Sequence, residues 1–69
     1  MKSVIKLLNM ESEKDVKIIQ SIIADNMGVI ASQVSLAKKE VVIIYNGSLF
    51  DKEKFVESIE DLGYVVMQG

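Results

Sequence analysis

The middle of the chain decides the fold, because residues 29–45 read VIASQVSLAKKEVVIIY. Two apolar runs rich in β-branched residues, Val29–Leu36 and Val41–Tyr45, flank the polar turn Ala37–Glu40. This pattern predicts two antiparallel strands joined by a short turn. One parity of the first run holds Ile30, Ser32, Val34 and Leu36. A strand that alternates in this way has one buried face and one open face.

A helix is expected before this pair of strands. Ser12 stands three residues ahead of Asp15 and just before an apolar run, which is the signature of a capping box. The serine hydroxyl can accept a backbone N–H, and the carboxylate can reach back to the N–H of the serine. The helical pattern continues to about Asn26. Gly28 is expected to stop the helix, because glycine tolerates the left-handed conformation that ends helices.

The same arrangement follows the pair of strands, and a further strand closes each end of the chain. Asp51 is expected to cap a second helix that ends at Gly63. The first and last strands of the chain are predicted over Val4–Asn9 and Tyr64–Met67. Residues 1–69 therefore predict a single α+β domain of βαββαβ order. This is a ferredoxin-like sandwich, in which the helices cover one face of a four-stranded antiparallel sheet.

Composition argues against several classes of function. The 69 residues carry a net charge of −2 and contain neither cysteine nor histidine. Such a chain presents no basic footprint for nucleic acid or for an anionic membrane, and no apolar run approaches the roughly 20 residues that span a bilayer. Without a thiol or an imidazole we expect no enzyme. The first residues enter an alternating pattern at once, which predicts no signal peptide and a soluble cytoplasmic protein.

Several short motifs resemble those of the heavy-metal-associated domain family. The most specific is Ile59–Tyr64, which reads Ile-Glu-Asp-Leu-Gly-Tyr and resembles the family's Ile-Glu-x-x-Gly-Tyr. The other similar segments are Asn9-Met10, Gly28-Val29, Val34–Ala37 and Val41–Tyr45. The intervals between them fit the family pattern without a gap, and the resemblance covers nearly the whole chain.

The resemblance implies a copper(I) chaperone, or an N-terminal module of a copper-transporting P-type ATPase. In that family two thiolates bind the metal and pass it to a matching pair in a partner. On this sequence the two cysteine positions fall on Ser12 and Asp15. Copper(I) is a soft ion that prefers sulfur, whereas a hydroxyl and a carboxylate are hard ligands. We therefore expect no thiolate metal site and no cofactor, and a helix cap worth about 1 kcal/mol in its place.

The same loop could offer oxygen ligands to Ca²⁺ or Mg²⁺, from Glu11, Ser12, Glu13 and Asp15. Those ions need about six converging oxygens, so caps and solvated charges are the favoured interpretation. The resemblance also implies that Met10 packs inward. Tyr64 occupies a position that lies beside the metal loop in many bacterial members of the family, and we expect it to be a half-buried aromatic of the last strand.

The open face of the sheet is the strongest candidate for a functional surface. In the family's register, with strand order 4-1-3-2, the helices cover Ile5, Leu7, Val34, Leu36, Val41, Ile43 and Val66. The alternate positions point outward, and apart from Lys6 they are apolar: Val4, Leu8, Val42, Ile44, Val65 and Met67. An open antiparallel face is normally polar, and a contiguous apolar patch usually marks a contact surface. We expect this face to contact a second copy or a partner protein, although β-branched residues also suit strands by themselves.

Three functions remain open on the sequence. The first is a degenerate metallochaperone-like domain that acts in protein interaction or dimerisation without thiolate copper binding. The second is a heavy-metal carrier with altered or weak ligands. The third is a small-molecule-sensing regulatory domain, because the amino-acid-binding ACT domains have similar length and strand order. The Ile59–Tyr64 motif favours the metal-carrier family over the ACT domains.

Overall fold

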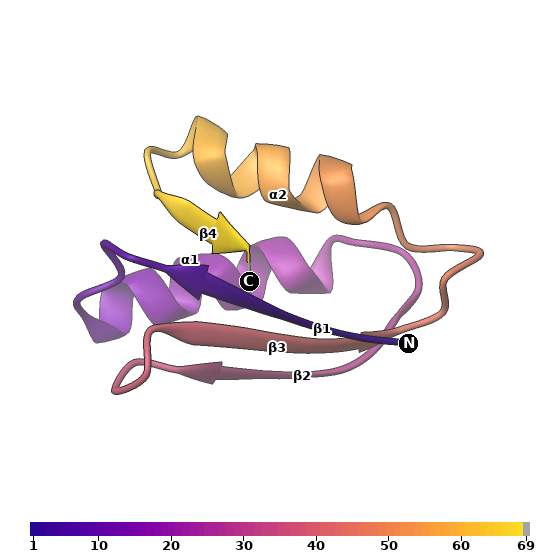
Figure 1. Ribbon diagram of the computed structural model, residues 1–69, viewed down its shortest axis with the longest axis horizontal. Helices are drawn as coiled ribbons and strands as arrows, with labels where there is room; N and C mark the ends of the chain where they lie inside the picture. The colour runs from indigo at the N-terminus through magenta and orange to yellow at the C-terminus, as the bar shows by residue number, and fades with distance from the viewer. Residues whose placement is uncertain (69) are drawn as a thin grey trace.

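A computed structural model describes residues 1–68 of the chain. Its elements follow the predicted βαββαβ order (Figure 1). They are β1 (Lys2–Leu7), α1 (Glu13–Ala24), β2 (Val29–Ser35), β3 (Glu40–Tyr45), α2 (Lys52–Asp61) and β4 (Val66–Gln68). Within this part of the chain, no helix has the length and apolar character needed to cross a bilayer.

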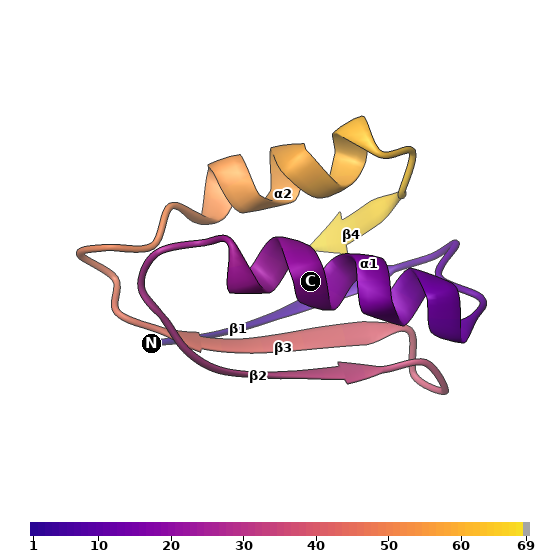
Figure 2. The same cartoon turned by 180° about the vertical axis from the view of Figure 1, so that it is seen from behind.

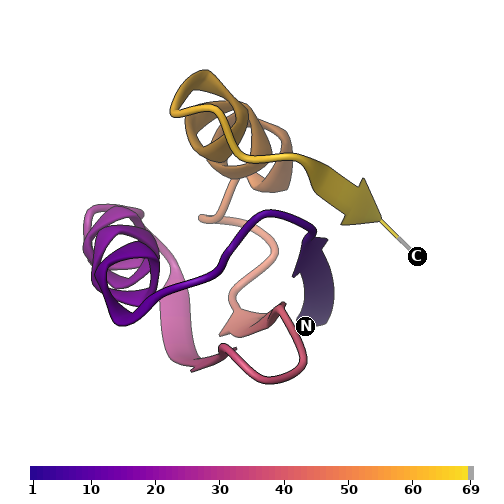
Figure 3. The same ribbon diagram turned by 90° about the vertical axis from the view of Figure 1, so that its left-hand side faces the viewer.

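The four strands form one antiparallel sheet in the order β2-β3-β1-β4, as predicted. Both helices lie on the same side of the sheet, with α1 behind the strands in Figure 1 and in front of them in Figure 2. Seen from the end, the sheet curves around this helical layer and leaves its other face open (Figure 3). The ferredoxin-like fold is therefore confirmed.

The core lies between the sheet and the two helices. Each helix buries one stripe of apolar residues, as its spacing in the sequence predicts. Three aromatic rings continue the core beyond β3: the centroids of Tyr45 and Phe50 are 4.7 Å apart, and those of Phe50 and Phe55 are 5.5 Å apart. The buried side chains are Ile5, Leu7, Met10, Val16, Ile19, Ile23, Val41, Ile43, Tyr45, Phe50, Phe55, Val56 and Ile59.

The first and last strands of the chain differ in extent from the prediction. β1 spans Lys2–Leu7 where Val4–Asn9 was predicted. It ends at Leu7 because the chain turns there, and the N–H of Met10 donates to the Leu7 carbonyl at 3.3 Å. β4 begins at Val66, so the expectation that Tyr64 belongs to this strand is wrong.

The end of α1 lies two residues before the predicted one, and Gly28 plays a different part from the one expected. The helix ends at Ala24, and the N–H groups of Asp25 and Asn26 close its last turn on the carbonyls of Ser21, Ile22 and Ile23. Gly28 therefore does not stop the helix. It has a φ of 91° and opens β2, where its carbonyl accepts a hydrogen bond of 2.8 Å from the N–H of Asn46.

A β-bulge lies at the start of β2. Val29 pairs with Tyr45, but Ala31 already pairs with Ile44, so Ile30 is an extra residue without a partner of its own. The bulge shifts the alternation by one position. Val29 packs against the core in place of Ile30, which is 70% exposed.

Candidate functional site

The two positions that correspond to the family's metal ligands form the start of α1. Ser12 is the N-cap residue and forms a capping box with Asp15. The Asp15 half of the box is the stronger half, because Oδ2 accepts the backbone N–H groups of Ser12 at 3.1 Å and of Glu11 at 3.0 Å. The Ser12 hydroxyl makes its clear hydrogen bond to the same carboxylate oxygen, at 3.2 Å. The predicted cap is thus present through the Asp15 carboxylate, and the Ser12 hydroxyl donates to that carboxylate instead of accepting a well-formed backbone N–H bond as predicted.

Tyr64 completes this network, a role that its sequence pattern did not indicate. Its hydroxyl donates to Asp15 Oδ1 at 2.6 Å, across 49 positions of the chain. The Tyr64 hydroxyl is the largest cause that lowers the pKa of Asp15 below 3.8, followed by the Glu11 N–H. Partial burial and the neighbouring carboxylate raise the pKa of Tyr64 to about 12. The neutral phenol and the charged carboxylate therefore stabilise each other over the whole neutral range.

Further hydrogen bonds fix the loop that leads into α1. The Asn9 side chain donates to the carbonyl of Gly63 at 2.9 Å and accepts the N–H of Val65 at 2.8 Å. The N–H of Leu8 donates to the carbonyl of Val65 at 3.0 Å. Met10 packs inward as the resemblance implied, with no exposed surface. The loop is thus joined to the segment before β4 through Asn9, Leu8 and the contact between Tyr64 and Asp15.

This loop does not fit a metal ion. Each oxygen of the Asp15 carboxylate already accepts hydrogen bonds from within the protein. Nowhere among residues 1–68 do three His, Cys, Asp or Glu side chains gather closely enough to hold a metal. The donors of Ser12 and Asp15 are hard oxygens, which suit copper(I) poorly. The arrangement can begin a helix and attach it to Tyr64, and this is the chemistry that its contacts support.

Replacing Tyr64 with phenylalanine should raise the pKa of Asp15 towards its usual value, because the largest cause of the lowered pKa is removed. The replacement should also change how the free energy of unfolding depends on pH in the alkaline range. A folded-state pKa of about 12 exceeds the ordinary value of 10.0, so the protonated phenol stabilises the fold below pH 10 and this contribution is lost towards pH 12. The Tyr64→Phe variant should lack this loss.

Carboxylate NMR titration of Asp15 measures the first effect, and urea unfolding at a series of alkaline pH values measures the second. Lysine titration affects both proteins alike, so the difference between them isolates Tyr64. An unchanged Asp15 pKa in Tyr64→Phe would contradict the role assigned to the hydroxyl.

The predicted interaction residues lie on the open face or at its end. Five of the six are between 43% and 53% exposed, and Val42 is half-buried. Val4 pairs with Val42 across β1 and β3, and Lys6 pairs with Met67 across β1 and β4. The exposed five are Val4, Leu8, Ile44, Val65 and Met67.

This face carries more charge than the sequence pattern indicated. The register pairs Lys2 with Ile44 and Lys6 with Glu40, so Lys2 and Glu40 join Lys6 on the open side. Both residues lie outside the strands predicted from the sequence, because Glu40 was assigned to the turn and β1 was predicted to begin at Val4. The open face is the side of the sheet away from the helices. Its outward strand residues include Lys2, Val4, Lys6, Glu40, Val42, Ile44 and Met67.

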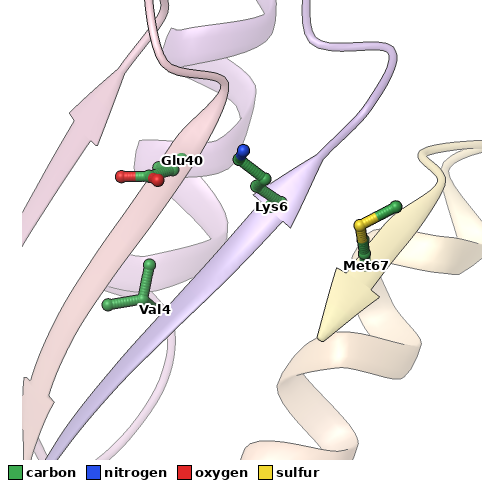
Figure 4. A pocket seen from close by; sticks show the side chains of 4 residues that line it. All are labelled: Val4, Lys6, Glu40 and Met67. Carbon is green, nitrogen blue, oxygen red and sulfur yellow. The ribbon is translucent and has the colours of Figure 1, made fainter. Parts of the chain in front are cut away.

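Two shallow hollows lie on the open face, one on each side of the central pair of strands. The larger, about 290 Å³, is lined by Val4, Lys6, Glu40 and Met67. In Figure 4 the Glu40 carboxylate points away from Lys6, so the two charged groups do not face each other. The smaller hollow, about 180 Å³, is lined by Ala31, Ser32, Gln33, Val42 and Ile44. The open face thus combines apolar floors with separated charges of both signs.

Known structures closely resemble this fold. A Bacillus anthracis protein named for copper-ion binding shares 27% identity over 97% of this chain and 94% of its own, with a TM-score of 0.89. The CopZ metallochaperone shares 22% over 97% of this chain and all of its own, with a TM-score of 0.88. The N-terminal domain of a potential copper-translocating P-type ATPase from Bacillus subtilis shares 21% over 97% and 84%, with a TM-score of 0.87.

Among curated proteins, none matches this sequence. The family model of the heavy-metal-associated domain, in contrast, matches residues 4–65. That range runs from β1 to the residue before β4, and it includes the capping box and the Ile59–Tyr64 motif. The chain belongs to the heavy-metal-associated domain family.

Proposed function

We propose that this chain is a metallochaperone-like domain that binds a protein through its open face and does not carry copper through thiolates. It is a binding domain and not an enzyme. The observation that carries the proposal is that the side chains at the family's two metal-ligand positions form hydrogen bonds within the protein. Ser12 and Asp15 are joined to each other, and Asp15 also accepts the Tyr64 hydroxyl. These side chains are engaged in building the protein and have no soft donor to offer a metal.

The open face supports the other half of the proposal. Solvent-facing strand positions are normally polar, yet here apolar side chains run along β1, β3 and the segment around β4. A contiguous apolar surface in a protein of this size lowers solubility unless a partner covers it. The apolar floor with charges at its margin has the composition of a small protein contact.

Photo-cross-linking in living cells tests this proposal. A photoreactive amino acid at Ile44, which is 43% exposed on β3, should form a discrete adduct with another polypeptide. The matched control places the same group at Glu57, which is exposed on α2 on the other side of the sheet. The Glu57 position should give no discrete adduct. Absence of an adduct from Ile44, or equal labelling from both positions, would overturn the proposed function.

A further inference from the structure

We infer that the partner of the open face is a second copy of this chain. The two copies are related by a two-fold axis that lies above the open face, parallel to the strands and over the boundary between β1 and β3. The inference rests on the proposed function and names the partner of that same surface. Its basis is the register of the central strands, where Val4 pairs with Val42 and Lys6 pairs with Glu40. The two members of each pair thus lie at one level along the sheet.

In a two-fold contact, this register places opposite charges over each other and apolar side chains over each other. A rotation of 180° about such an axis exchanges β1 and β3 but keeps each level along the strands. Lys6 of one copy then lies over Glu40 of the other copy, and the reverse contact forms as well, as an isologous interface requires. At the next level, Val4 lies over Val42 of the other copy.

The positions of the charges on the open face suit such a contact. Lys6 and Glu40 are direct neighbours across the strands, but the Glu40 carboxylate points away from Lys6 (Figure 4). A group above the sheet can therefore meet each of the two charges separately. A second copy offers the opposite charge at both places, with the apolar pair Val4 and Val42 at the next level along the strands. Two sheets in such a pair pack with their strands nearly aligned.

The size of the open face sets the expected strength of the dimer. The strands β1 to β4 have 6, 7, 6 and 3 residues. At about 3.3 Å per residue and about 4.8 Å between strands, they cover on the order of 350 Å² in projection. A standard interface buries about 800 Å² on each partner, so this contact belongs to the weak class. We expect a reversible dimer whose population rises with protein concentration.

Sedimentation velocity over about 10 μM to about 1 mM, the range in which weak interfaces associate, should show a monomer that converts to a dimer. The Lys6→Glu and Glu40→Lys variants should each raise the dissociation constant at least about tenfold, because like charges then oppose each other at both symmetric contacts. Circular dichroism of each variant confirms that it is folded.

Mixing the Lys6→Glu and Glu40→Lys variants gives the sharpest test. In a mixed dimer, the introduced glutamate of the first variant would oppose the introduced lysine of the second. The unaltered Glu40 of the first would oppose the unaltered Lys6 of the second, so both contacts are again favourable. An equimolar mixture should therefore dimerise at concentrations where each variant alone does not.

The matched control for the charge variants is Lys17→Glu, which makes the same charge change on the exposed surface of α1. Because α1 lies on the other side of the sheet from the open face, this variant should dimerise like the unaltered chain.

Three results would overturn the inference: a monomer at every concentration, a dimer indifferent to Lys6→Glu, or a mixture that stays monomeric. An Ile44 adduct with a different protein, in a chain that stays monomeric, would overturn the second copy as partner but leave the proposed function standing. Failure of the Ile44 cross-link in cells, with a dimer that responds to the charge variants, would instead reject a cellular role for the contact.

Discussion

Joint replacement of Ser12 and Asp15 by cysteine should give a chain that binds one Cu(I) ion and keeps it against a competing chelator. The unaltered chain should lose Cu(I) to the chelator under the same conditions. Both side chains already converge, because the Ser12 hydroxyl lies 3.2 Å from an Asp15 carboxylate oxygen. Two thiolates placed there would provide the soft donors that Cu(I) prefers. The measurement is a titration of the reduced protein with Cu(I), followed by chelator competition.

The control for this gain is a dithiol elsewhere on the same helix. Glu13→Cys with Lys17→Cys places two thiols four residues apart on the exposed side of α1, where no loop fixes their geometry. It should hold Cu(I) more weakly. The Ser12/Asp15 variant should also lose the helix cap, so without metal it should unfold at a lower urea concentration than the unaltered chain. Equal retention by both dithiols would show that the loop contributes nothing to binding.

Replacing Gly28 with alanine should destabilise the fold by about 3 kcal/mol, from the strain of a left-handed backbone and from a steric clash. Gly28 has a φ of 91°, and an added Cβ would lie 2.8 Å from the Leu49 Cβ and from the Phe50 backbone nitrogen. One of these neighbours is backbone, so it cannot move aside as a flexible side chain can. Since small domains are stable by only about 0.05–0.15 kcal/mol per residue, this loss is a large part of the stability of a 69-residue chain. Urea unfolding measures the loss.

Gly63 supplies the matched control. Its φ is 97°, but nothing lies within 4 Å of the position of an added Cβ. The Gly63→Ala variant should therefore incur only the conformational cost, about 1 kcal/mol. Equal losses in the two variants would mean that the close approach of residues 49 and 50 to Gly28 has no energetic weight.

The sequence was sufficient to predict the order of elements and most of the buried stripe, whereas the strand order was implied by the family resemblance. Alternation and helical spacing are properties of near neighbours, so they can be read locally. The bulge at Ile30 could not, because it depends on how β2 pairs with β3. In the sequence Ile30 and Val34 share one parity, but the bulge places them on different sides of the alternation.

The loop was predictable in part. The pairing of Ser12 with Asp15 follows from their spacing, and the structure contains it. The contact from Tyr64 to Asp15 joins residues 49 positions apart and has no local signature. The charges on the open face were missed for a related reason: whether Lys2 and Glu40 belong to the sheet depends on where β1 and β3 pair, and the end of a strand is the least certain part of a sequence pattern.

The irregular start of β2 also bears on whether the protein can polymerise. β2 is an edge strand of the sheet, and a straight edge strand would present unpaired N–H and C=O groups on which other chains could add without limit. The extra residue at Ile30 bends that border and interrupts the regular spacing that an incoming strand needs. In a chain of which 49% of the residues are hydrophobic, this local defect is a protection against fibre growth.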